Sequence, residues 1–385
     1  MKTLYYFPLE QYPERYTALM SCKDGWAEDH FKEAGVKFVR VEGKQISKTI
    51  RAGSVLDAAG RCAYSMSQLT TFIEKYLPKV KDGDVVYLED FWHLGAESLF
   101  YIRALTGKKF KIGCFCHAQS VDESDFTYPM RHWMRPIEKG FARQYDYIFT
   151  CSKILREKLI SAGVAKDGGS NIHTVGLPFN SYKLMCQLRK MGMRKLPEKE
   201  PFVLFSSRFD DEKDPMFFLD LVERCPDIQF RLVSPYTTRP VSRNPEVMER
   251  LTRLIRRPNS NLALIPTHDK LAYYTALAKA WVQFNCANQD WVSWTLVEAT
   301  LFNCHPLYPR WKDFPLELRN RKANLYVKRD LADCERKLRG LMKKYRNDIT
   351  KYAHDGDCGF VFEKHDRSWP RYLEIMGLTK KGVAV

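Results

Sequence analysis

The chain has 385 residues, of which 45% are hydrophobic and 28% are charged, and this composition predicts a soluble, folded protein large enough for two domains. No stretch of eighteen apolar residues occurs and the N-terminal residues lead directly into a predicted strand, so we expect neither a membrane-spanning helix nor a secretory signal. The eleven scattered cysteines indicate reduced core residues of a cytoplasmic protein and argue against a disulfide framework. The formal net charge of +16 predicts an anionic partner: nucleic acid, a membrane surface or an acidic glycan.

Strand-like and helix-like segments alternate through the first 180 residues, which predicts an α/β domain. Residues 110–116 form one of the predicted strands, and His117 follows it directly. On a strand Cys114 and Cys116 face one side and His117 faces the other. We therefore predict no metal site at these three residues.

A predicted helix further along the chain carries a basic stripe. Arg131, Arg135, Lys139 and Arg143 recur every four residues, so their side chains lie on one face of the helix, which Pro136 interrupts. Further basic faces are predicted at residues 250–257 and 337–346. Each of these faces alone can also be an ordinary solvated helix surface, but positive charge spread over the whole chain fits an elongated polyanion.

A polar, basic segment that contains Pro197 separates two regions of alternating strands and helices, and we interpret it as a linker. The predicted organisation is a first domain of residues 1–185, a linker of residues 186–200, a second domain of residues 201–360 and a C-terminal segment of residues 361–385 that contains a helix.

The first strand of the second domain ends in a loop with two basic residues. Residues 202–205 form a predicted buried strand, and a helix is predicted from Met216. Arg208 and Lys213 lie between them, where a basic pair can clamp phosphate oxygens. Surface arginine and lysine residues are usually only solvated, so this loop alone does not define a site.

A later strand-to-helix loop carries two carboxylates, Asp290 and Glu298. Residues 281–285 form a predicted buried strand, and the helix is predicted from Trp294. Several backbone N–H groups are unpaired at such a helix start and the helix dipole favours an anion, so a diphosphate is expected there. The expected contacts are the backbone N–H groups of Ser293, Trp294, Thr295 and Leu296. The alternative is that Asp290 caps the helix and Glu298 is an ordinary helix acid.

Together the two loops resemble those of the retaining glycosyltransferases of GT-B fold that carry a glycosyltransferase group 1 domain. The Gly-Arg-Leu…Glu-Lys-Gly loop of that family is matched by residues 207–209 and 212–214, with the spacing between arginine and lysine kept. Its Glu-x7-Glu element is matched by Asp290 and Glu298, with the first glutamate shortened to aspartate. Residues 271–280 resemble the helix that precedes this element. The resemblance covers residues 200–310 well and the rest of the chain in outline.

This resemblance implies an α/β fold of two Rossmann-like, doubly wound domains that face a central cleft, with the C-terminal helix crossing back to the first domain. It implies a nucleoside diphosphate sugar as co-substrate, no metal or other cofactor, and transfer with retention of configuration. Arg208 and Lys213 would neutralise the diphosphate, Asp290 would orient the sugar and Glu298 would bind the ribose. His117 matches a histidine that the family often carries at a strand end near the transferred sugar. We therefore take His117 and Asp290 as the candidate catalytic residues, while a structural histidine that closes the strand remains the alternative for His117.

Two departures from the family pattern leave the substrates open. The Gly-Gly loop that normally follows the first strand is absent, because residues 5–7 run into a segment from Pro8 to Tyr16. The acceptor side of the protein can therefore be built differently. Asp290 in place of glutamate withdraws its carboxylate by one methylene, which leaves the donor sugar open.

Positive charge and a second resemblance point to the acceptor. Residues 90–95 and 117–126 are similar to segments of phage and metagenomic glycosyltransferases, and viral enzymes of this architecture decorate hydroxymethylated pyrimidines in DNA. We therefore expect duplex DNA as the partner, contacted by the Arg131, Arg135, Lys139 and Arg143 stripe. Two alternatives remain: a glycosyltransferase that acts on a lipid or polysaccharide at the membrane surface without stable insertion, and a non-catalytic nucleic-acid-binding protein of the same fold.

Overall fold

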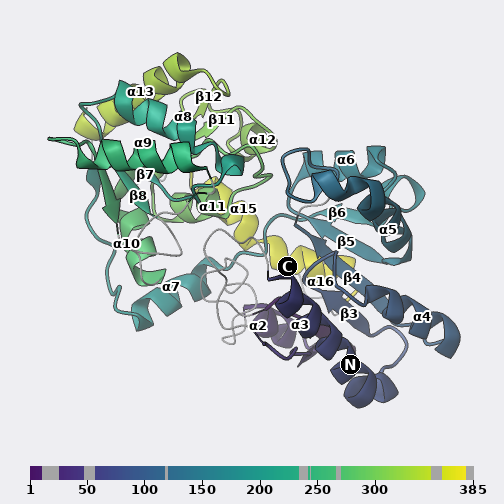
Figure 1. The fold of residues 1–385 in the computed structure, drawn as a ribbon. Helices are drawn as coiled ribbons and strands as arrows, with labels where there is room; N and C mark the ends of the chain where they lie inside the picture. The colour runs from purple at the N-terminus through teal and green to yellow at the C-terminus, as the bar shows by residue number, and fades with distance from the viewer. Residues whose placement is uncertain are drawn as a thin grey trace. The chain divides into compact units, whose positions relative to one another are not determined.

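In a computed structural model, the chain forms two compact units of parallel β-sheet and α-helix (Figure 1). One unit comprises Met1–Phe179 and Arg367–Val385, and the other comprises Asn180–Asp366. The structure describes residues 1–10, 26–46, 57–117, 120–233, 242, 244–265, 270–347 and 358–378. The segment predicted to replace the Gly-Gly loop lies outside the described residues from residue 11 onwards. None of the helices within the described ranges is long and apolar enough to cross a bilayer.

The first unit is a six-stranded parallel sheet with helices between its strands. The strands are β1 (Thr3–Phe7), β2 (Lys37–Arg40), β3 (Val85–Leu88), β4 (Lys111–Cys116), β5 (Tyr147–Thr150) and β6 (Ile172–Thr174). The helices are α2 (Trp26–Glu33), α3 (Ala58–Thr71), α4 (Ala96–Thr106), α5 (Arg131–Gln144), α6 (Lys153–Ser161) and α16 (Ser368–Ile375). The strand order is β2-β1-β3-β4-β5-β6, so the order reverses between β1 and β3. Ligands of doubly wound sheets bind at such a switch point, outside the carboxyl ends of the strands.

Helix α16 packs in the first unit although it comes from the end of the chain. The buried ring of Tyr372 lies 4.5 Å from that of Phe149 in β5, between ring centroids, and its hydroxyl donates to the Gly176 carbonyl at 3.3 Å. Ser368 Oγ donates to the Leu177 carbonyl at 2.8 Å. The second unit ends at Asp366, and the chain returns to the first unit at Arg367, just before this helix.

The second unit is also a six-stranded parallel sheet. Its strands are β7 (Glu200–Phe205), β8 (Gln229–Val233), β9 (Leu262–Ile265), β10 (Ala280–Phe284), β11 (His305–Pro309) and β12 (Leu325–Tyr326). Its helices are α7 (Ser181–Lys190), α8 (Pro215–Arg224), α9 (Pro245–Arg256), α10 (Lys270–Lys279), α11 (Trp294–Leu301), α12 (Phe314–Glu317), α13 (Leu331–Asn347) and α15 (Phe360–Asp366). The order β12-β11-β10-β7-β8-β9 reverses between β7 and β10. Helix α7 occupies the start of the predicted linker.

Helices cover the second sheet in two layers and hold its strand ends in place. Helices α8, α9 and α13 enclose one core with the sheet, whereas α10 and α11 lie on the other side (Figure 1). In that core the ring of Phe205 in β7 stacks on Phe218 of α8, with 4.4 Å between the centroids. Trp281 of β10 is buried, and its indole N–H donates to the Leu341 carbonyl of α13 at 2.9 Å. Apolar burial and buried hydrogen bonds of this kind fix β7 and β10 relative to each other. The architecture confirms the predicted α/β class with two doubly wound parallel sheets.

Candidate functional site

The two loops singled out from the sequence lie side by side at the switch point of the second sheet. Strands β7 and β10 are neighbours, with Phe205 opposite Phe284 at their carboxyl ends. The loops that follow therefore leave the sheet together, and Lys213 Nζ lies 2.5 Å from Asp290 Oδ1. Residues 77 positions apart in the sequence thus form one ion pair where a doubly wound sheet binds its ligand.

Both members of this pair are held in their charged forms. Burial alone would lower the pKa of Lys213, but the neighbouring Asp290 and Glu212 carboxylates outweigh burial and raise it. Burial likewise opposes ionisation of Asp290, yet Lys213, a hydrogen bond from Asn285 at 3.3 Å and the charge of Lys312 keep its pKa below the usual value. The Lys213 ammonium also donates to Gln289 Oε1 at 3.3 Å. An ammonium has three protons, so these two bonds leave one for a ligand oxygen.

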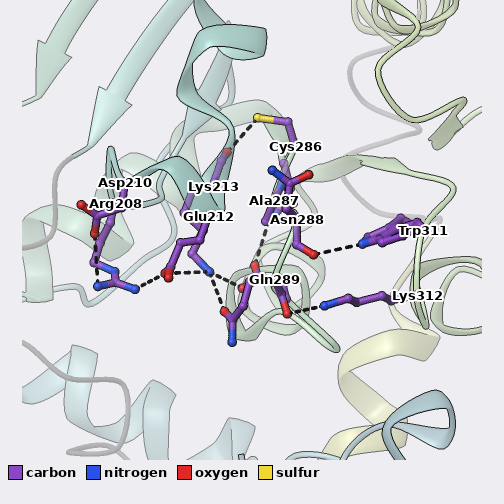
Figure 2. Close-up of polar contacts among 12 residues, drawn as sticks. Arg208, Asp210, Glu212, Lys213, Cys286, Ala287, Asn288, Gln289, Trp311 and Lys312 are labelled. Atoms are coloured by element: carbon purple, nitrogen blue, oxygen red, sulfur yellow. Dashed lines mark hydrogen bonds and ion pairs between the residues drawn. The ribbon is translucent and has the colours of Figure 1, made fainter. Parts of the chain in front are cut away.

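Arg208 is bound by two acids that the sequence analysis did not select as site residues. Its guanidinium donates to the Glu212 carboxylate and lies 3.3 Å from Asp210 Oδ2, with 29% of the side chain exposed (Figure 2). Arg208 and Lys213 therefore face three carboxylates, those of Asp210, Glu212 and Asp290. The loop is thus an acid-base network rather than an isolated basic clamp. The guanidinium has five N–H donors, so a diphosphate can use those that Glu212 and Asp210 leave open or can displace one of these acids.

A third cation comes from the loop after β11, which the sequence comparison also missed. Lys312 Nζ donates to the Gln289 carbonyl at 2.8 Å and lies 4.0 Å from the centroid of the Trp291 ring. Trp311, beside it, donates its indole N–H to the Asn288 carbonyl at 3.1 Å (Figure 2). With Lys312 included, the site holds three cations and three carboxylates, so its formal charges cancel.

The sequence feature that could have indicated Lys312 is the run Arg310-Trp311-Lys312 directly after a buried strand.

Backbone contacts join the two loops into one structure. The Asn288 N–H donates to the Glu212 carbonyl at 2.8 Å, and Cys286 Sγ donates to the Lys213 carbonyl at 3.2 Å (Figure 2). These contacts fix the β7 loop against the β10 loop beside the ion pair. The site is therefore preorganised, so the protein loses less conformational entropy when a ligand binds.

The start of helix α11 has the geometry that an anion site requires. Ser293 has extended backbone angles, φ −82° and ψ 129°, and its carbonyl accepts from the Leu296 N–H at 3.1 Å. The N–H groups of Trp294 and Thr295 belong to the first helical turn, at the positive end of the helix dipole. Both residues are partly exposed. They lie just after Asp290, so the predicted diphosphate contacts and the ion pair share one loop.

Glu298 is buried within α11 and bound by two tyrosines of α10. The Tyr273 hydroxyl donates to Oε2 at 2.6 Å and the Tyr274 hydroxyl donates to Oε1 at 2.7 Å, and only 4% of the residue is exposed. Burial raises the pKa of Glu298, and the two hydrogen bonds offset part of that effect. Each carboxylate oxygen has a second lone pair. Ribose binding by Glu298 stays a prediction, and it requires access to those lone pairs beside the tyrosines.

Replacing Glu298 with alanine is expected to destabilise the folded protein by about 2–4 kcal/mol, because two buried hydroxyls lose their acceptor. Glu298→Gln keeps an acceptor oxygen and is expected to cost less than half of that. Chemical denaturation measures both differences. Glu249→Ala, which removes an exposed acid of helix α9, is the control and is expected to change stability by less than about 0.5 kcal/mol. Equal, small effects for Glu298→Ala and Glu249→Ala would show that Glu298 is only an ordinary helix acid.

The other candidate catalytic residue, His117, lies at the carboxyl edge of the first sheet. It follows β4, is partly buried, and its Nε2 lies 2.8 Å from the Glu89 carbonyl, which follows the neighbouring strand β3. A carbonyl oxygen only accepts, so Nε2 carries the proton in this contact and the ring orientation is fixed. Its role in sugar binding stays a prediction.

Polar residues that the sequence did not single out lie around the switch point of the first sheet. Glu89 is 1% exposed, accepts a hydrogen bond from the Tyr6 hydroxyl of β1, and has its pKa raised to about 8 by burial. Arg61 of α3 bridges Glu10 at 2.8 Å and Asp90 at 2.6 Å. The available signal was two acids, Glu89 and Asp90, directly after a buried strand. This cluster makes the first unit's switch point a second polar site.

The predicted basic stripe lies along one flank of α5. Its buried face carries Met134, Glu138 and Ala142, so residues spaced by four from Arg131 lie beside that face. Arg131 packs 4.2 Å above the Tyr128 ring, and Arg135 donates to the Ser120 carbonyl at 2.5 Å. Lys139 is partly buried and Arg143 is exposed. The four side chains therefore lie along one flank of α5, and their contact with DNA stays a prediction.

The described residues hold no group of three or more histidine, cysteine or acidic side chains arranged to bind a metal ion. Among the described cysteines, Cys114 and Cys116 are buried residues of β4.

Solved structures share the whole architecture at low sequence identity. The catalytic domain of starch synthase IV from Arabidopsis thaliana, bound to ADP and acarbose, matches with a TM-score of 0.65 and 12% identity over 98% of this chain and 99% of that one. The Anabaena protein HepE, in complex with UDP and glucose, matches with a TM-score of 0.64 and 11% identity over 98% and 100%. Sucrose-phosphate synthase from Thermosynechococcus elongatus matches with a TM-score of 0.62 and 14% identity over 98% and 97%.

No protein-family model matches the sequence, and a search of curated protein sequences also gives no match. The structural matches show that the chain has the GT-B fold of these glycosyltransferases.

Proposed function

We propose that this chain is a glycosyltransferase that moves a sugar from a nucleoside diphosphate sugar to an acceptor, with retention of configuration. The observation that carries the proposal is the Lys213 and Asp290 ion pair, 2.5 Å apart at the switch point of the second sheet. Two of the structural neighbours bind sugar-nucleotide-related ligands: HepE is in complex with UDP and glucose, and starch synthase IV is bound to ADP and acarbose. A site with one lysine proton for phosphate and an adjoining carboxylate for hydroxyls suits this ligand class.

In the proposed reaction the bond between the anomeric carbon and the diphosphate oxygen breaks, and the electron pair leaves with the diphosphate. Arg208, Lys213 and the N–H groups of Ser293, Trp294 and Thr295 would stabilise this growing negative charge. The Leu296 N–H, which the sequence also predicted as a contact, is instead bonded to the Ser293 carbonyl at 3.1 Å. The acceptor hydroxyl oxygen would attack the anomeric carbon from the face that the diphosphate leaves, and its proton would pass to a departing phosphate oxygen. No protein nucleophile is required. Asp290 would orient the sugar hydroxyls, Glu298 would bind the ribose, and His117 is the candidate catalytic residue of the first unit.

For the acceptor we propose duplex DNA that contains hydroxymethylated pyrimidines. The net charge of +16 supports a polyanion, and the hydroxymethyl group supplies the nucleophilic oxygen. A base inside a duplex is inaccessible, so the enzyme would act in a groove or on a flipped nucleotide. The proposal includes no metal, and the nucleoside diphosphate sugar is a co-substrate rather than a bound cofactor.

Transfer of radiolabelled sugar tests donor and acceptor together. A panel of labelled nucleoside diphosphate sugars is offered with hydroxymethylated DNA, with unmodified DNA of the same sequence, or with a membrane extract. The proposal predicts label in the hydroxymethylated DNA alone. Label in the lipid fraction and not in DNA would contradict the DNA acceptor and would indicate a membrane acceptor. Binding of DNA without transfer or hydrolysis of any sugar nucleotide would identify a non-catalytic nucleic-acid-binding protein.

A further inference from the structure

A basic surface surrounds an exposed tryptophan at the end of the second sheet away from β9. Strands β11 and β12 pair, with Pro309 opposite Tyr326, and the Arg310 N–H donates to the Tyr326 carbonyl at 2.7 Å. The loops that follow these strands therefore leave the sheet next to each other. We call their residues the Trp311 surface: Arg310, Trp311, Lys312, Lys328 and Arg329.

The charge of this surface is poorly neutralised. Residues 310–329 include seven lysines and arginines but only two acids, Asp313 and Glu317. Both acids are buried, and Glu317 is bound to Lys364 at 2.5 Å and His365 at 3.0 Å. The Arg329 side chain is 71% exposed and its nearest ion-pair distance is 3.7 Å, to Asp214. Burial and then the nearby Arg329 lower the pKa of Lys328 to about 8, which agrees with an excess of positive charge.

Other basic surfaces of the second unit differ, because acids pair with their arginines. Arg250 of α9 lies 2.7 Å from Asp220 and also binds Glu223. Arg339 of α13 lies 2.8 Å from Asp227 and 2.9 Å from Glu335. Arg250 and Arg339 are therefore each held between two acids, whereas the ion pair of Arg329 in the Trp311 surface is longer, at 3.7 Å.

The tryptophan of this surface is exposed but held in position. The Trp311 residue is 40% exposed, and its indole N–H donates to the Asn288 carbonyl at 3.1 Å. Lys328 Nζ lies 4.3 Å from the ring centroid and covers one face of the ring. A planar ligand group can stack on the other face at a low cost in side-chain entropy, since the ring is already ordered.

We propose that the Trp311 surface binds a strand of nucleic acid, with one base stacked on Trp311 and backbone phosphates at Arg310, Lys328 and Arg329. An ordered aromatic ring beside Arg310, Lys328 and Arg329 matches the way proteins bind single strands, which combines base stacking with phosphate contacts. The inference rests on the proposed nucleic-acid acceptor and concerns an unpaired or flipped stretch of it, because the bases of an intact duplex cannot stack on a side chain. Through the contacts of Trp311 and Lys312 with residues 288 and 289, this surface also supports the loop that carries Asp290.

Fluorescence anisotropy with a labelled single-stranded oligonucleotide, without any sugar donor, tests the inference. Trp311→Ala is expected to weaken binding about 5- to 100-fold through lost stacking. The Arg310→Ala and Arg329→Ala double variant, which leaves the Asn288 contact intact, is expected to weaken binding and to reduce the slope of log K against log salt by about 0.7 per lost phosphate contact. The Arg250→Ala and Arg339→Ala double variant removes two paired arginines and is the charge-matched control, expected to bind within about 2-fold of the unaltered protein.

Three results would overturn the inference. The first is equal binding by the Arg310→Ala and Arg329→Ala variant and the unaltered protein. The second is loss of binding only in an Arg131→Ala and Arg143→Ala variant, which would place the contact on α5. The third is binding to anionic lipid vesicles but not to the oligonucleotide. Nucleoside diphosphate binding is measured on every variant, because its absence in the unaltered protein would contradict the proposed function itself. Retained nucleotide binding with no oligonucleotide binding would contradict only the Trp311 surface.

Discussion

Replacing Lys213 with alanine is expected to lower kcat/KM for sugar transfer by about 100- to 1,000-fold. Lys213 would neutralise the departing diphosphate, and it also holds Asp290 in place through the contact of 2.5 Å. Its removal deletes the phosphate contact and leaves burial of the Asp290 carboxylate opposed only by Asn285 and Lys312, so the pKa of Asp290 rises. Steady-state kinetics with the preferred sugar nucleotide measures the loss.

Lys279→Ala provides the matched control for this result. Lys279 also pairs with a carboxylate, Glu200, at 3.0 Å, but Glu200 is the first residue of β7 and lies at the opposite edge of the sheet from Lys213. The control is expected to retain activity within about 3-fold, as a surface ion pair contributes little. Equal losses in the two variants would show a general effect of charge or stability and would contradict a phosphate role for Lys213.

The stability of the protein is expected to fall between pH 4.5 and about 8 because of Glu89, with its pKa raised by burial to about 8 from 4.5. The folded state holds the Glu89 proton in this range and the unfolded state releases it. The stabilisation is therefore complete below pH 4.5 and is lost as the pH rises through the folded-state pKa. The difference corresponds to an upper limit on the order of 5 kcal/mol, at about 1.4 kcal/mol for each pH unit.

Glu89→Gln isolates this effect, because the neutral amide imitates the protonated carboxyl and can still accept from Tyr6. Thermal melts of the variant are expected to depend less on pH, with a higher Tm than the unaltered protein at pH values near 8. Glu97→Gln, at an exposed position of α4, is expected to leave the pH profile unchanged. Parallel pH profiles of the unaltered protein and Glu89→Gln would show that Glu89 ionises normally.

Local patterns in the sequence were sufficient to predict the α/β class and to single out the two loops of the candidate site. Alternating apolar strands and amphipathic helices predict doubly wound parallel sheets, since parallel strands require crossover helices. Loops that follow parallel strands leave the sheet at one edge, so both loops were expected at that edge, whereas the ion pair between Lys213 and Asp290 was not predicted. Motif spacing carried this inference because each motif lies within a single loop.

The partners of those residues depend on packing between distant segments and could not be predicted in the same way. Trp311 and Lys312 reach the Asp290 loop only because β11 lies next to β10 in the sheet. Glu298 is enclosed by Tyr273 and Tyr274 because α10 packs against α11, and single-helix periodicity does not show which helices meet. The sequence predicted only a phosphate contact for Arg208. In the structure the loop folds so that the Glu212 carboxylate accepts a hydrogen bond from the Arg208 guanidinium.

Binding of nucleoside diphosphates, measured by isothermal titration calorimetry on the unaltered protein and on Lys213→Ala, tests the central claim most directly. The site between the loops after β7 and β10 predicts that at least one nucleoside diphosphate binds with one molecule per chain. Binding should weaken at least about 10-fold in Lys213→Ala, in line with loss of one charge-assisted phosphate contact. No binding of any nucleoside diphosphate at millimolar concentration, or equal affinity in the two proteins, would contradict a nucleotide-sugar site at Lys213 and Asp290.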